Sequence, residues 1–340
     1  MFNSDYFHSA VPQRPQAKYA HIVVLRETDS YALFQTDGEL NTARVSTGRT
    51  LNTAMITRIT MFKRKQTTPE RLIGRELLRG YGFTSGEQAD GKRTEDSQKR
   101  LICDYNVRFC MQCPDCISYG FAIGDSGSEK SKIYSDTAYS LTAYDISHEA
   151  FTLNAPYESG TMSRQGVPTS RINEQDHIRP QTLFPAVITF RDPTEAMFNY
   201  VLNNVLRTRR YGAQTTRTGT VTNHPVAILF SDGEVFSNLA LTQALYDELA
   251  ANDKVHASDP VHSADALAFL PGVIEQLLTT TSTAIKQSVT GNELTNVLES
   301  FRLRTQSQEG MQSLLQAAFN DSSRYYEQYV RKDNKAKKEK

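Results

Sequence analysis

The residues with the clearest potential for chemistry are four cysteines within the segment 103–116, CDYNVRFCMQCPDC. They are all the cysteines of a 340-residue chain. Cys110, Cys113 and Cys116 are each separated by two residues, and Cys103 lies a short way upstream. Proline and aspartate between the last two favour a turn, so this segment is able to wrap around one small ion.

This spacing predicts a structural metal centre. In a reducing cytosol, clustered cysteines are more often metal ligands than disulfides. Zinc takes four thiolates in a tetrahedron and stabilises a loop too small for its own core, whereas a catalytic zinc keeps one position open. We therefore expect structural zinc held by Cys103, Cys110, Cys113 and Cys116. Two alternatives stay open: an iron–sulfur cluster, which also takes four cysteines, and His148 as a ligand in place of Cys103.

Basic residues are concentrated in two segments of a chain whose net charge is zero. Residues 40–69 contain six lysines and arginines and no acid, and residues 196–231 contain four arginines and no acid. Residues 232–275 contain eight acids and one lysine. This asymmetry indicates a protein that binds a polyanion on one side, with the acid-rich segment facing elsewhere.

The two basic segments offer the groups that hold a nucleic-acid backbone. Arginine matches phosphate oxygens, hydroxyl groups donate to them, and glycine lets backbone N–H groups approach. A tyrosine is able to stack on a base. Solvated surfaces and the helix dipole are the alternative reasons for arginines in such places. The candidate contacts with such a backbone are Arg44, Arg49, Asn52, Thr53, Arg58, Lys63, Arg64, Arg207, Arg209, Arg210, Tyr211, Gly212 and Arg217.

Hydrophobic periodicity predicts an α+β fold. Alternating apolar residues predict strands at 19–26, 31–35, 52–62, 184–190 and 224–230. Start signals and apolar stripes predict helices from Pro69 and Pro193 onward and at 238–251, 263–279, 292–304 and 309–330. The long polar excursions 80–100 and 156–183 read as functional insertions, and the tail 331–340 is too polar to pack.

The chain has no feature of a membrane protein. No apolar run reaches the length of a membrane span, and residues 1–16 lack the basic and apolar regions of a signal peptide. We expect a cytoplasmic protein without a membrane partner.

Three stretches together resemble the backbone subunit of type I-D CRISPR effector complexes (Cascade), a branch of the Cas-seven superfamily. They are CDYNVRFCMQCPDCISYGFAIG, APYESGTMSRQGVPTSRI and FPAVITFRDPTEAMFNYVLNNVLRTRRYGAQTTRTG. The resemblance runs from about residue 18 to residue 305 and is most specific between residues 100 and 220.

The resemblance implies a single domain over 18–330 with an RNA-recognition-motif (ferredoxin)-like core. A zinc-binding insertion would occupy 80–155 and a thumb hairpin 156–183. Copies would stack along a guide RNA (crRNA) beside other subunits of the effector complex and present the guide for pairing with a target DNA strand. Within the thumb, Met162 or Val167 would be the apolar wedge and Arg164 or Arg171 the phosphate clamp.

The resemblance also bears on catalysis. Type III relatives cut bound RNA with an aspartate in the loop before the first helix, whereas residues 40–69 contain no acid. We therefore expect a scaffold without catalytic residues. A metal-dependent nuclease using Asp29 or Asp37 is the alternative. A zinc-ribbon transcription regulator is a third interpretation, but no helix with base-reading side chains lies beside the cysteines.

Overall fold

A computed structural model gives the fold, and most of the chain is described by it. The described residues are 2–35, 39–86, 101–123, 127–152, 174–212, 214–256 and 258–331, together with the backbone of 163–164 and 167–168. None of the helices in these ranges is both long enough and apolar enough to cross a membrane.

The centre of the fold is a five-stranded antiparallel sheet with the order β16-β15-β1-β14-β8. Its long strands are those that alternation predicted at 19–26, 184–190 and 224–230. β1 lies between β14 and β15 and pairs antiparallel with both, Ile22 lying opposite Ile188 on one side and Ile228 on the other. The strand bounds are β1 Tyr19–Thr28, β8 Ile133–Tyr134, β14 Leu183–Arg191, β15 Val221–Ser231 and β16 Ile285–Thr290.

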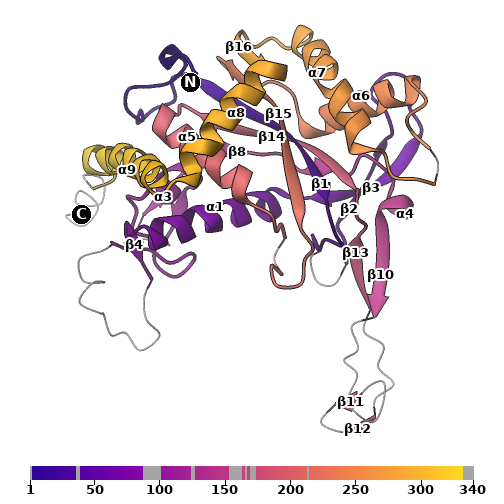
Figure 1. Ribbon diagram of the computed structural model, residues 1–340, viewed down its shortest axis with the longest axis horizontal. Coiled ribbons are helices and arrows are strands. Elements are labelled where there is room, and N and C mark those ends of the chain that lie inside the picture. Colours follow the sequence, from indigo (N-terminus) through magenta and orange to yellow (C-terminus); the bar gives the residue numbers. More distant parts are fainter. Residues whose placement is uncertain are drawn as a thin grey trace.

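Helices cover both faces of this sheet (Figure 1). Because side chains of a strand alternate between faces, Ile22 and Val24 enter one core while Val23 and Leu25 enter the other. The first core is closed by α1 Lys63–Gly80, α3 Pro114–Tyr119, α5 Glu195–Arg207, α8 Gly291–Gln306 and α9 Gln308–Tyr325. The second is closed by α6 Asn238–Ala251 and α7 Ser263–Thr279. Burial of both sets of side chains is the main stabilising contribution.

Two smaller groups of strands extend from the body. β2 Thr42–Ser46 and β3 Met55–Met61 form a hairpin that β9 Ala138–Tyr139 extends. β10 His148–Thr152 and β13 Glu174–Ile178 form a ribbon that projects away from the body, with β11 Ser163–Arg164 and β12 Val167–Pro168 beyond its end (Figure 1).

The remaining elements are short. They are η1 Ser4–Tyr6, β4 Thr84–Ser85, β5 Leu101–Ile102, β6 Phe121–Ala122, β7 Ser128–Glu129, α4 Tyr144–Ser147 and η3 Tyr326–Val330, a π-helical turn.

Two of the sequence expectations about elements were wrong. Residues 31–35 form one isolated bridge, between Ala32 and Ile178, and no continuous strand. α1 begins at Lys63, so Pro69 lies inside it. A helical proline has no N–H to donate to the carbonyl four residues earlier, and here that carbonyl belongs to Lys65. The N–H of Gly212 donates to the Lys65 carbonyl at 3.2 Å instead. A different segment of the chain therefore supplies the hydrogen bond that Pro69 cannot make.

Candidate metal centre and nucleic-acid interface

The four cysteines come together around one point. The Sγ atom of Cys103 lies 3.8 Å from that of Cys113 and 3.6 Å from that of Cys116, and Cys110 lies 4.0 Å from Cys116. All four sulfurs lie within 4.8 Å of one another. Zinc–sulfur bonds of about 2.3 Å in a tetrahedron place the sulfurs about 3.8 Å apart, so this donor set fits zinc.

Local backbone geometry brings the cysteines to this arrangement. The backbone N–H of Cys110 donates to Cys103 Sγ, and that of Cys113 donates to Cys110 Sγ, both at 3.3 Å. Cys113 is the N-cap of α3, Pro114 begins the helix, and Cys116 lies in its first turn. Pro114 and Asp115, which the sequence predicted in a turn, therefore form the start of this helix.

Two arginines from α1 face this centre. Arg75 donates from Nη2 to Cys103 Sγ at 3.3 Å and from Nη1 to Asp115 at 2.5 Å. Arg71 donates to both carboxylate oxygens of Asp115, at 3.1 and 2.8 Å. All three side chains are buried. A centre of four thiolates and one divalent cation would carry two negative charges. The two arginines and Asp115 together carry one positive charge, so they would offset one of the two.

The same surroundings shift the titration of the thiols. Hydrogen bonds from the other three thiols, followed by the neighbouring Arg75, hold the pKa of Cys103 well below its ordinary value. Hydrogen bonding to Cys103 raises the pKa of Cys110 and Cys116, and burial raises that of Cys113. The hydrogen bonds among the thiols and the neighbouring Arg75 therefore favour one negative charge within the cluster.

The structure does not support His148 as a replacement for Cys103. His148 begins β10, where its ring stacks on Tyr144 at 4.3 Å and its Nε2 lies 3.3 Å from Asp176. Cys103 itself completes the cluster. The alternative ligand set was therefore wrong.

The first basic segment forms the β2–β3 hairpin and the start of α1. Arg44, Arg49, Thr53 and Arg64 are exposed and remain candidates for contact with RNA. Lys63 as a whole is also exposed, but its partly buried Nζ donates to the carbonyl of Ile133 at 2.9 Å. This partial desolvation lowers the pKa of the ammonium group.

Two residues of this segment have structural roles. Arg58 is fully buried, its guanidinium donates to the backbone carbonyls of Ser140, Leu141 and Thr47, and burial lowers its pKa to about 10. The side chain of Asn52 donates to Asp247 at 3.0 Å. The prediction that Arg58 contacts phosphate is corrected, because all its donors face the interior.

The second basic segment forms the loop between α5 and β15, here termed the arginine loop. Arg207 donates to Asn203 and to the carbonyl of Thr305, which ties the end of α5 to α8. Arg209 is exposed but pairs with Asp29 at 2.8 Å. Arg210 and Arg217 are exposed, and Arg210 also donates to the carbonyl of Thr218.

Tyr211 and Gly212 anchor this loop to the interior of the protein. Tyr211 is fully buried and its hydroxyl lies 3.1 Å from Glu70 Oε1, so the prediction that its ring stacks on a base is corrected. Gly212 has a φ of +94°, and a Cβ atom there would lie 2.1 Å from the carbonyl oxygen of Leu33. Its backbone approaches Leu33 and Lys65 of the protein itself, which is why only glycine fits.

Arg210 and Arg217 line a cavity of about 460 Å³, here termed the arginine cavity. Its other walls include Tyr31, from the segment that follows β1, together with Phe151 of β10 and His177 of β13. The Tyr31 and Phe151 rings meet edge to face at 4.7 Å. Exposed arginines beside aromatic rings and hydroxyl groups are the combination that holds a single-stranded polyanion.

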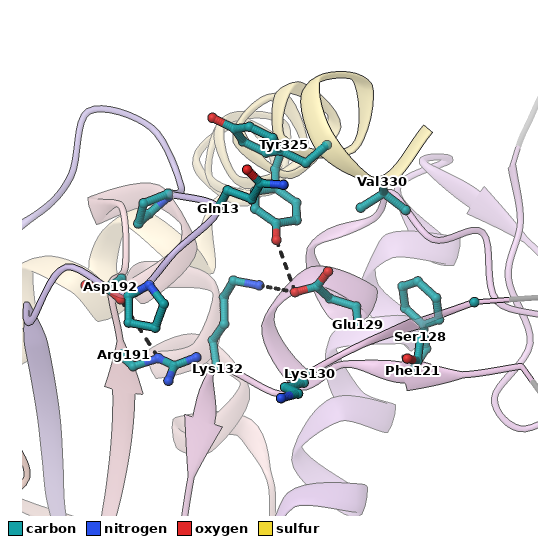
Figure 2. Close-up of a pocket in the computed structure, with 14 residues that line it drawn as sticks. Gln13, Phe121, Ser128, Glu129, Lys130, Lys132, Arg191, Asp192, Tyr325 and Val330 are labelled. Carbon is teal, nitrogen blue, oxygen red and sulfur yellow. Dashed lines mark hydrogen bonds and ion pairs between the residues drawn. The ribbon is translucent and has the colours of Figure 1, made fainter. Parts of the chain in front are cut away.

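A second cavity, of about 470 Å³, lies between the N-terminal segment, β7–β8 and the end of the helical C-terminal region (Figure 2). Its Glu129 accepts from Lys132 at 2.7 Å and from the Tyr325 hydroxyl at 3.2 Å. Its Asp192 accepts from the backbone N–H groups of Gln16 and Lys18 at 3.1 Å. These bonds join the β7–β8 segment to α9 and join Asp192 to the N-terminal segment. No predicted site residue lines this cavity.

Two predicted thumb residues, Met162 and Arg171, lie outside the described residues. Asp37 of the nuclease alternative lies outside them as well. Arg164 and Val167 are described only as backbone, in β11 and β12.

Sequence reasoning missed the partners of the predicted residues. Arg71 and Arg75 lie one helical turn apart on α1 and face the cysteines. About 40 residues of sequence separate them from Asp115, with which both form ion pairs. Tyr31, Phe151 and His177 come from separate strands or loops, so no sequence motif unites them.

The structure therefore defines an α+β protein with a buried four-cysteine centre and an arginine-bearing loop beside an open cavity. The profile of the family described as Csc2 Crispr matches residues 6–315, and the chain belongs to that family. Comparison with curated proteins found no match.

A solved structure agrees with this fold. The chain is similar to the Csc2 protein of Thermofilum pendens, with a TM-score of 0.55 and 13% identity over 96% of this chain and 95% of that one. A chain of a structure described as a CRISPR RNA-guided surveillance complex, pre-nicking, has a TM-score of 0.47 and 10% identity over 81% of this chain and 93% of its own. The second similarity is too distant to carry an argument.

Proposed function

We propose that this chain is a non-catalytic backbone subunit that binds guide RNA in a type I-D CRISPR interference complex. Copies stack along the guide, contact other subunits of the complex, and leave the guide bases free to pair with a target DNA strand. The observation that carries this proposal is the arginine cavity of a Csc2 family member, where two exposed arginines flank aromatic rings. Contacts of this kind hold a backbone without reading its sequence.

The strand order supports an RNA-recognition-motif-like core within a single domain, residues 18–330. β15-β1-β14-β8 are neighbours in the sheet, α1 lies between β1 and β8 in sequence, and α5 lies between β14 and β15. We assign 80–155 as the zinc-binding insertion, 156–183 as the thumb, and 331–340 as a basic tail. The ribbon of β10 and β13 projects from the body and flanks most of this segment in the sequence, which supports the thumb assignment (Figure 1).

We assign zinc to the four cysteines as a structural ion. The spacing of the sulfurs fits a closed tetrahedral shell, and four protein ligands leave no position for a substrate. When bound, zinc supplies cross-links between β5, the following loop and α3. The chain contributes the four sulfurs and the charge compensation from Arg75.

The nuclease alternative has less support. The carboxylate of Asp29 accepts from Arg209 at 2.8 Å and from the Thr222 hydroxyl at 2.8 and 2.9 Å. Within the described ranges, the group of side chains able to hold a metal ion is the cysteine cluster. The contacts of Asp29 with Arg209 and Thr222 support a role of Asp29 in holding the arginine loop.

The double variant Arg210→Ala/Arg217→Ala tests the proposed RNA contact. We expect weaker binding of single-stranded RNA and a log–log salt dependence flatter by about 1.4, because each lost phosphate contact removes about 0.7. Oligouridine and oligoadenine should lose affinity alike, since backbone contacts carry no sequence information. The measurement is the affinity of labelled oligonucleotides over a series of salt concentrations.

The matched control is Arg302→Ala/Arg304→Ala, which removes the same charge from exposed positions on α8. This control should keep nearly the wild-type salt slope. An unchanged slope in the Arg210→Ala/Arg217→Ala variant, or a loss confined to one base, would remove the arginine cavity from the RNA path.

Assembly gives a second test of the proposed function. A head-to-tail contact that does not close should give particles whose mass grows in steps with the length of added RNA. The protein should also co-purify with small RNA of defined length. A dimer of constant mass, whatever RNA is added, would contradict stacking along a guide.

A further inference from the structure

One carboxylate of the acid-rich segment binds the tip of the basic β2–β3 hairpin. Asp247, on α6, accepts backbone N–H groups from Arg49 and Thr50 at 2.8 Å, from Leu51 at 3.3 Å and from Asn52 at 3.1 Å. It is buried by these contacts. We infer that Asp247 is a positioning residue that fixes the β2–β3 loop for RNA binding, an inference that rests on the proposed function.

The loop is shaped to admit this carboxylate. Gly48 approaches it so closely that a Cβ atom at this position would lie 1.8 Å from Asp247 Oδ1. The N–H of Gly48 donates to the carbonyl of Asn52 at 2.6 Å and closes the loop around the acid. Successive backbone N–H groups that converge on one point form an anion-binding nest, and Asp247 fills this nest.

Other residues of α6 hold the same hairpin. Gln243 donates from Nε2 to the carbonyl of Ser46 at 2.9 Å. The guanidinium of Arg58 lies 5.5 Å from the ring centre of Tyr246. Figure 1 shows α6 beside β2 and β3. The expectation that the acid-rich segment faces away from the basic segments is therefore wrong at Asp247.

The backbone and the side chains of the β2–β3 loop have different roles. Its backbone N–H groups are used by Asp247, whereas the side chains of Arg49 and Thr53 are exposed. A loop fixed before it meets its ligand loses less conformational freedom on binding, which raises affinity. The acid thus favours binding of an anion although its own charge is negative.

Asp247 keeps its charge over the physiological range. Burial opposes the charged form, but hydrogen bonds from Thr50, Asn52, Leu51 and Arg49 outweigh it and lower the pKa below the ordinary 3.8. A group with a depressed folded-state pKa stabilises the fold above its unfolded pKa and loses this contribution only as the pH falls through the folded value. RNA binding should therefore show no contribution from Asp247 titration between about pH 5 and pH 8.

The test compares Asp247→Ala, Gly48→Ala and Arg49→Ala with labelled oligouridine as the probe. We expect Asp247→Ala to bind roughly tenfold more weakly, with a salt slope flatter by about 0.7, because Arg49 no longer holds its place. Gly48→Ala should reproduce this result, since its methyl group displaces the carboxylate and changes no charge. The double variant Asp247→Ala/Arg49→Ala should flatten the salt dependence of RNA binding no more than Arg49→Ala alone.

Glu248→Ala is the matched control, because it removes a negative charge from the next position of α6. It should leave RNA affinity nearly unchanged. Asp247→Asn keeps one oxygen acceptor and should fall between wild type and Asp247→Ala. Tighter binding by Asp247→Ala, or a lower melting temperature with an unchanged salt slope, would overturn the positioning role.

The outcome is separable from that of the proposed function. If Arg210→Ala/Arg217→Ala weakens RNA binding and the Asp247 variants do not, only the positioning role fails. If neither set changes RNA binding, the proposed interface itself fails.

Discussion

Cys113→Ser is expected to abolish zinc binding and to unfold the segment around α3. Cys113 is buried and is the N-cap residue of α3. Its Sγ atom lies 3.8 Å from that of Cys103. A hydroxyl is a poor replacement for a thiolate, and structural zinc contributes roughly 10 kcal/mol or more to the folding of small zinc domains. Elemental analysis should find about one zinc per wild-type chain and none in the variant, and urea unfolding should begin at a lower concentration.

Val107→Ser is the matched control for this prediction. Val107 lies in the same loop, is 75% exposed and offers no ligand atom, so this variant should keep both zinc and the unfolding midpoint. Wild-type protein that contains iron and absorbs visible light would favour the iron–sulfur alternative. A metal-free protein with the wild-type fold and four reactive thiols would rule out both.

Local patterns in the sequence predicted most of the central fold. Alternation found β1, β14 and β15, whose two faces are both buried, and apolar stripes found α5 to α9 within a few residues. The start of α1 was missed because Pro69 is a strong start signal. Only the tertiary contact from Gly212 to Lys65 explains how the helix continues through that proline.

The metal centre was predictable because its ligands are close in sequence. Cys103 and Cys116 enclose a short segment, and local turns bring the four sulfurs together. The interface was predictable only in part. Whether an arginine on a strand points outward, as Arg44 does, or inward, as Arg58 does, depends on what packs against that strand. Asp247 could not be found from sequence, because almost 200 residues separate it from the loop that it holds.

The loop that bears the arginines is also anchored to the core by a buried ion pair. Glu70 and Arg26 are both fully buried and pair at 2.9 Å, and Glu70 accepts from the Tyr211 hydroxyl at 3.1 Å. Arg26 also donates to Gln66 at 2.8 Å, and its guanidinium lies 5.0 Å from the Tyr211 ring centre. α1, β1 and the arginine loop therefore meet at one carboxylate.

Glu70→Ala is expected to lower the free energy of unfolding by about 3–5 kcal/mol, because it leaves the Arg26 guanidinium buried without its counter-charge. The loop that follows Tyr211 should loosen as well, so hydrogen exchange at residues 214–221 should rise at denaturant concentrations where the core stays folded. Glu76→Ala is the matched control, since Glu76 is exposed on the same helix and should change stability by no more than about 0.5 kcal/mol.

A second variant separates the buried charge from the cavity left by a shortened side chain. Arg26→Met/Glu70→Leu removes both charges and keeps most of the volume, so it should be more stable than Glu70→Ala. It should still loosen the arginine loop, because the Tyr211 hydroxyl loses Glu70 as an acceptor and keeps only its contact with Asn223. If Glu70→Ala is as stable as Glu76→Ala, the ion pair does not anchor the loop. If the double variant is the less stable of the two, lost packing and not the unpaired charge explains the effect of Glu70→Ala.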